Sequence, residues 1–123
     1  MNSNLTIVLR FLLGLIFLVM GLNKFLQFIP APPMEGPPAD FMGALAATGY
    51  MFPMIAITEI VAGALLILNK WSGLALILAA ILSVNIILFH LVFAPASIAA
   101  GAVVAFLTVV LIYANWKKFK TLF

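Results

Sequence analysis

Glu59 is the residue in this sequence whose chemical type and position most need an explanation. It lies near the middle of YMFPMIAITEIVAGALLILN, residues 50–69, a run that is otherwise almost wholly apolar. A carboxylate near the centre of a membrane-spanning helix costs roughly 2.5 to 3.5 kcal/mol on insertion scales. The isoleucine, leucine and valine residues around it contribute about 0.3 to 0.6 kcal/mol each in the opposite direction, so we expect the segment to insert. Glu59 is therefore a candidate proton acceptor or a partner in a buried ion pair.

Other polar side chains interrupt the remaining apolar runs, and these are Arg10, Lys24, Asn85 and His90. One interpretation is a polar pocket in which Glu59 and His90 are catalytic, as proton acceptor and donor, while the others bind a ligand or supply a counter-charge. The alternative is a buried ion pair between Glu59 and Lys24 or Arg10, braced by Asn85, that fixes helix register without chemistry. Arg10 and Lys24 could also snorkel to the two membrane surfaces.

Several kinds of chemistry are excluded by residue types that the chain lacks. It contains no cysteine and a single histidine, His90. Thiol–disulfide exchange, thiolate metal sites and a haem held by two histidines are thus ruled out. No carboxylate is suitably spaced from His90 for a metal site, and we predict none. Six basic residues spread over a hydrophobic chain do not indicate nucleic-acid binding.

The composition places these residues in a membrane. Of 123 residues, 67% are hydrophobic and only 7% are charged, which is too few for the surface of a soluble domain. A helix crosses the hydrocarbon core with roughly 20 residues, and the apolar runs are that long. They show no alternation of apolar and polar residues, so helices and not barrel strands are predicted. Residues 1–123 should form a single, all-α, polytopic membrane domain.

The predicted architecture is an antiparallel bundle of four transmembrane helices, and the expected spans are residues 5–28, 50–69, 71–93 and 96–116. Arg10, Lys24 and the glycines between them share one face of the first span, which should let another helix approach closely. Small residues also recur every four positions at the start of the last span, as Ser97, Gly101 and Ala105. Whether their partner is internal or a second copy is left open.

The outer loop, residues 30–49, begins with the proline-rich stretch PAPPMEGPP, which predicts an extended connector. Asp40 is the expected N-cap and Gly49 the expected C-terminal stop of a short interfacial helix that follows. Glu35 and Asp40 lie in this loop, whereas four lysines lie on the opposite side of a four-span bundle. The positive-inside rule then puts both termini in the cytoplasm. The lysines at the end of the chain could also hold anionic lipid, but an orientation signal is the simpler interpretation.

Several segments, taken in order, resemble the DoxX-like family of small four-helix bacterial membrane proteins. They are Arg10 with LLGLIFLVMGLNKF, then TGYMFP, Glu59 and the later GALLIL, NIILFH ending in His90, and the terminal YANWKKFKTLF. The resemblance implies a bundle in the bacterial inner (cytoplasmic) membrane, similar in plan to the vitamin K epoxide reductase-like type. It also implies a link to quinone oxidoreductases, notably of thiosulfate, or to thiol- and superoxide-handling enzymes. The absence of cysteine departs from members that relay electrons through thiols.

Two functions are consistent with these observations. The first is a redox-associated membrane subunit, at most a quinone-linked oxidoreductase subunit, which binds quinone in the outer half of the bundle. Lys24 or Asn85 would bond a ring oxygen, and Arg10, in the inner half, is a further ligand-binding candidate. The second is a non-catalytic accessory or assembly subunit of a larger membrane complex. Its partners would be the lipid bilayer and either other membrane subunits or a second copy. A solute carrier fits less well, because there is one midplane carboxylate and no credible inverted repeat.

Overall fold

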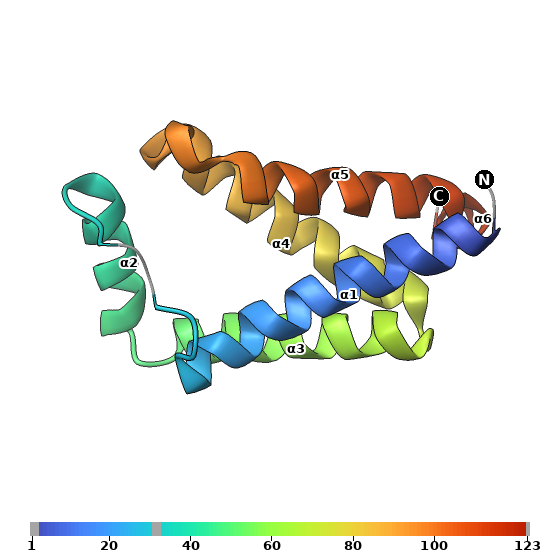
Figure 1. Ribbon diagram of the computed structural model, residues 1–123, viewed down its shortest axis with the longest axis horizontal. Helices are drawn as coiled ribbons and strands as arrows, with labels where there is room; N and C mark the ends of the chain where they lie inside the picture. The colour runs from blue at the N-terminus through green and yellow to red at the C-terminus, as the bar shows by residue number, and fades with distance from the viewer. Residues whose placement is uncertain (1–2, 31–32, 123) are drawn as a thin grey trace.

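The computed structural model describes residues 3–30 and 33–122, and this part of the chain contains helices but no strand. The α-helices are α1 (Ser3–Leu26), α2 (Pro37–Ala47), α3 (Met51–Leu68), α4 (Ser72–Phe93), α5 (Ala99–Ala114) and α6 (Trp116–Phe119), with short 3-10 turns η1 (Pro95–Ser97) and η2 (Lys120–Leu122) (Figure 1). Helices α1, α3 and α4 are long and apolar enough to cross a membrane. The prediction of an all-α, polytopic membrane bundle is confirmed.

The last apolar helix is shorter than the predicted span of residues 96–116. Pro95 opens a 3-10 turn that runs to Ser97, and α5 begins only at Ala99. It ends at Ala114, where the chain turns and the side-chain amide of Asn115 donates to the Leu111 carbonyl, 2.8 Å away. With 16 residues, α5 is about 24 Å long, somewhat less than the hydrocarbon thickness of about 30 Å.

Helices α1 and α3 lie in close contact along the glycine face of α1. Gly14 and Gly63 meet backbone to backbone: a Cβ atom added to Gly63 would lie 2.6 Å from the Gly14 carbonyl oxygen. One added to Gly21 would lie 2.7 Å from the carbonyl oxygen of Ala56. No side chain fits at such distances, so glycine is what allows this approach. The expected close packing on this face is confirmed, and its partner is α3.

Helices α4 and α5 form a second antiparallel pair. Gly101 is buried against α4, and a Cβ atom added to it would lie 2.8 Å from the Ile86 side chain. Ser83 and Thr108 share a buried hydrogen bond of 3.2 Å across the same interface. The small-residue face at the start of α5 therefore has an internal partner at Gly101, whereas Ser97 is exposed.

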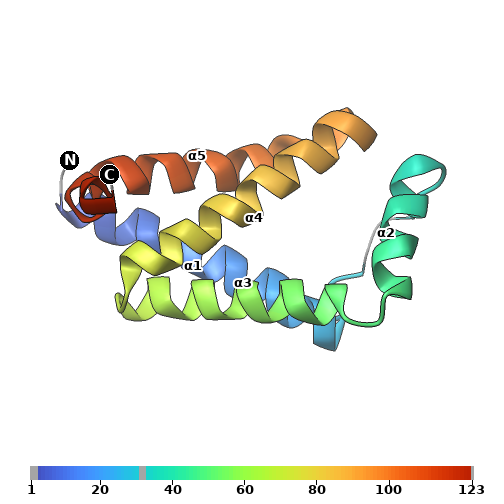
Figure 2. The same ribbon diagram turned by 180° about the vertical axis from the view of Figure 1, so that it is seen from behind.

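The α1–α3 pair and the α4–α5 pair converge at the end of the molecule where both chain termini lie. They diverge toward the other end, where α2 lies (Figures 1 and 2). The apolar core accordingly draws on all four long helices, with Leu13, Phe17, Leu66, Leu76 and Leu111 almost fully buried. A short connector joins α3 to α4, with left-handed backbone at Asn69 (φ 53°) and Trp71 (φ 48°). This tight turn makes the two helices antiparallel neighbours, as predicted.

The outer loop differs from the sequence prediction at the start of α2. Gly36, with φ 71°, is the N-cap, so the prediction of Asp40 as N-cap is wrong, and Asp40 lies in the first turn. The extended connector was predicted to reach residue 38, but Pro37 and Pro38 are the first two residues of the helix. Proline is tolerated there because the first backbone N–H groups have no partner within the helix. Gly49, with φ 77°, follows the end of α2 as expected. Residues 31–32 of the connector lie outside the described residues.

Candidate functional site

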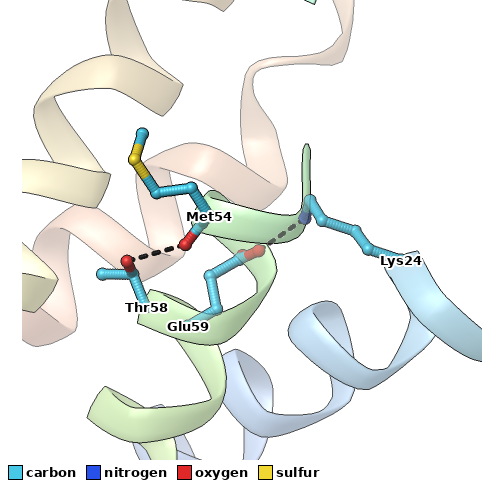
Figure 3. A network of polar contacts seen from close by, with 4 residues as sticks. All are labelled: Lys24, Met54, Thr58 and Glu59. Atoms are coloured by element: carbon cyan, nitrogen blue, oxygen red, sulfur yellow. Dashed lines mark hydrogen bonds and ion pairs between the residues drawn. The ribbon is translucent and has the colours of Figure 1, made fainter. Parts of the chain in front are cut away.

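Glu59 pairs with Lys24 between α3 and α1. Its Oε1 atom lies 2.6 Å from Lys24 Nζ, and the two side chains point toward each other (Figure 3). Glu59 is almost fully buried, with 1% of its surface exposed, whereas the Lys24 side chain retains 27%. The contact is a charged pair between a buried carboxylate and a partly exposed ammonium group. Of the two partners that the sequence offered, the structure selects Lys24.

The glycine contact explains why these two side chains meet. Gly21 packs against the Ala56 backbone, and Lys24 and Glu59 each follow three residues later on their helices. Positions three apart lie on the same face of an α-helix. The two helices run antiparallel, so both side chains reach back across the same narrow interface. The ion pair is thus a consequence of the close approach at Gly21.

Arg10 holds the opposite end of the same interface. Its Nη1 atom donates to the carbonyl oxygen of Leu66 and, at 3.4 Å, to that of Ile67. These carbonyls lie in the last turn of α3, where the helix dipole favours a cation, and the Leu66 oxygen also accepts from the backbone N–H of Asn69. Arg10 therefore caps α3 and does not pair with Glu59. Together the Arg10 cap and the Lys24–Glu59 pair fix α1 against α3 at both ends; we refer to them as the α1–α3 clamp.

The other two candidate residues lie on α4 and bond to their own helix. The Asn85 side chain is exposed and donates to the Ile81 carbonyl at 2.9 Å. His90 Nδ1 lies 2.8 Å from the Ile86 carbonyl oxygen, and its ring meets that of Phe89 edge-on at 5.3 Å. Within the described part of the chain, neither forms a hydrogen bond or ion pair with Glu59. The structure thus brings Lys24 to Glu59 and leaves Asn85 and His90 apart from them.

Besides the Arg10 bonds to α3, two further polar contacts between helices were not predicted from the sequence. One is the buried Ser83–Thr108 hydrogen bond between α4 and α5. The other joins Lys118 Nζ to Ser72 Oγ, at 2.5 Å, near the start of α4. Serine and threonine can bond to their own helix, so nothing in their spacing shows which of them reach another helix. Among the described residues, no group of three or more His, Cys, Asp or Glu side chains is placed to hold a metal ion.

The fold and these contacts define a small polytopic membrane protein whose intramembrane polar groups are bonded mainly within the bundle. The family model for DoxX matches residues 5–91, which include nearly all of α1 and α4 and the whole of α2 and α3. The chain belongs to the DoxX family, and the resemblance noted in its sequence is confirmed. The comparison with curated proteins and that with solved structures gave no match.

Proposed function

We propose that this chain is a non-catalytic accessory subunit of a larger, redox-associated membrane complex. The observation that carries the proposal is the α1–α3 clamp. Arg10, Lys24 and Glu59 are engaged in holding two helices together, and no contact in the described residues joins Glu59 to His90 as an acid–base pair. Residues placed in this way support a stable scaffold. The redox setting is inferred from the resemblance of DoxX-like proteins to subunits of quinone-linked oxidoreductases.

The partners would be other membrane subunits or a second copy of this chain, within the bacterial inner membrane. Both termini lie at one end of the molecule, as an even number of crossings requires (Figure 1). Lysines in the α3–α4 connector and after α5 gather at that end. The positive-inside rule therefore supports cytoplasmic termini, with α2 outside, for a chain that acts as one membrane domain.

A quinone site at Lys24 is a second candidate, and a specific observation favours it. The Lys24 side chain is 27% exposed beside the buried carboxylate, and an ammonium group has three N–H donors. A quinone oxygen that reaches this ammonium would accept a hydrogen bond from it. Glu59 would then take up a proton released when the quinol form gives its electrons to another subunit of the complex. In this alternative Glu59 is the first residue to test. His90 would have to transfer protons from its place on α4, where, in the described part of the chain, it forms no hydrogen bond or ion pair with Glu59.

Purification of the complex in mild detergent separates the two candidates. The accessory role predicts a defined stoichiometry with other chains, the same quinone content in wild type and Glu59→Gln, and unchanged turnover in His90→Gln. If wild type carries quinone and a folded Glu59→Gln variant loses it, the accessory role is wrong and the quinone site is supported. A chain that purifies alone under the same conditions would also contradict the accessory role.

A further inference from the structure

The lysines that follow α5 line a hollow on the surface of the folded chain. Lys117, Lys118 and Lys120, with Tyr113 and Trp116, border an open hollow of about 660 Å³. It lies at the end of the bundle that carries both termini, where α5 gives way to α6 (Figure 1). In a membrane this is the level of the lipid headgroups, and tyrosine and tryptophan are enriched there.

The backbone that carries these lysines is anchored from both sides. Phe119 is 5% exposed and belongs to the apolar core, although it lies between lysines in the sequence. Lys118 Nζ donates to Ser72 Oγ and ties α6 to the start of α4. A site whose backbone is already fixed loses less entropy when it binds a ligand than a flexible basic tail would.

The charge of the hollow is not neutralised by neighbouring side chains. The chain has three acidic residues: Glu35 and Asp40 lie around the start of α2 at the far end, and Glu59 is paired with Lys24. Among the described residues, the side chains of Lys117 and Lys120 make no hydrogen bond or ion pair, although the backbone N–H of Lys120 donates to the Trp116 carbonyl. The hollow therefore suits an anion at the membrane surface.

A second, apolar groove lies along the seam between α4 and α5, beside the middle of α4 and the last turns of α5. It has a volume of about 260 Å³, and Leu88 on α4 and Ala105 and Val109 on α5 are among its lining residues. Val109 lies one helical turn before Tyr113, so the groove and the lysine hollow share one side of α5. A ligand with a charged head and an apolar tail would match both.

We propose that this chain binds an anionic phospholipid, with the phosphate in the lysine hollow beside Tyr113 and Trp116 and one acyl chain along the α4–α5 groove. The inference rests on the membrane setting and not on the accessory or quinone role. Lys117 and Lys120 supply charge, while Lys118 is positioned by Ser72.

Native mass spectrometry of the delipidated protein tests this proposal, with dioleoyl phosphatidylglycerol as probe and dioleoyl phosphatidylcholine for comparison. Each lysine near an anionic headgroup contributes about 1 kcal/mol, so Lys117→Gln with Lys120→Gln should weaken phosphatidylglycerol binding about thirtyfold. The matched control is Lys70→Gln, in the α3–α4 connector at the same end but outside the hollow. It should change binding less than twofold.

Three results would overturn the proposal or a part of it. If Lys70→Gln weakens binding as much as either lysine variant alone, about fivefold, the attraction is diffuse and there is no site. If millimolar inorganic phosphate displaces the lipid completely, the hollow is a site for a soluble anion. If Ala105→Leu, which fills the groove, leaves dioleoyl phosphatidylglycerol binding unchanged, the acyl chain does not lie between α4 and α5.

Discussion

Substituting the two members of the Lys24–Glu59 pair should have unequal effects on stability. Lys24→Met leaves the carboxylate of Glu59 buried without a partner, and Glu59 is 1% exposed. Breaking a buried pair in this way costs about 3 to 5 kcal/mol. The variant could instead bury Glu59 in its protonated form, at a similar cost. An ordinary glutamate has a pKa of about 4.3, and protonating it at pH 7, roughly 2.7 pH units higher, costs about 1.4 kcal/mol for each unit.

The reverse substitution should be milder. Glu59→Leu leaves Lys24 without its partner, but 27% of the lysine side chain is already exposed and its long stem can carry the ammonium to water. We expect a loss on the order of 1 kcal/mol. The double variant, Glu59→Leu with Lys24→Met, removes both charges and fills the space with apolar groups, so its stability should be close to that of wild type.

Unfolding by SDS in mixed micelles should be measured for wild type, the two single variants and the double variant. It gives the change in the free energy of unfolding for each variant and, from these three changes, the coupling energy between Lys24 and Glu59. The predicted order of stability is wild type and double variant together, then Glu59→Leu, then Lys24→Met. Equal losses in the two single variants would refute the argument from unequal burial. A protonated carboxyl band in the infrared spectrum of wild type at neutral pH, absent in Glu59→Gln, would refute the ion pair itself.

Three further substitutions test the packing of the helix pairs by the same unfolding assay. Gly63→Ala places a methyl group 2.6 Å from a carbonyl oxygen of α1 and should lower the free energy of unfolding by about 1 to 3 kcal/mol. Gly43→Ala, in open space on α2, should be neutral or slightly stabilising. Equal effects of the two substitutions would contradict the close approach of α1 and α3. Arg10→Met keeps the apolar stem but removes the bonds to the end of α3, for an expected loss of about 1.5 to 3 kcal/mol, and an unchanged stability would mean that the cap contributes nothing. Ser83→Ala should cost about 0.6 kcal/mol, the average for such bonds in membranes, and should cost nothing when Thr108→Val is already present.

Much of the fold follows from hydrophobic length and the positions of glycine and proline. The bounds of the first three spans agree with α1, α3 and α4 within two residues, because apolar length and breaks at Pro30 and Asn69 are read directly from the sequence. Helix α5 is shorter than the span predicted over residues 96–116, because nothing in the hydropathy indicates that the chain turns at Asn115. Asp40 was chosen as a cap by residue type, although two prolines just before it were able to open the helix earlier.

The candidate site was only partly predictable for a different physical reason. Lys24 lies on the glycine face of α1, so its position on the contact surface could be derived from helical periodicity. Which helix packs there depends on the three-dimensional arrangement, so the sequence alone does not decide between Arg10 and Lys24 as the partner of Glu59. The self-bonding of Asn85 and His90 could not be foreseen, because it depends on the direction of each side chain along α4.

We propose that the Lys24–Glu59 pair supports structure and that the chain acts as an accessory subunit. To test this, the complex is purified from membranes that express the Glu59→Leu, Lys24→Met double variant. Its subunit stoichiometry, bound quinone and redox turnover are then measured. We predict an intact complex with the quinone content and turnover of the wild-type complex. An intact complex that has lost its quinone or its turnover would contradict this account and assign the pair a chemical role.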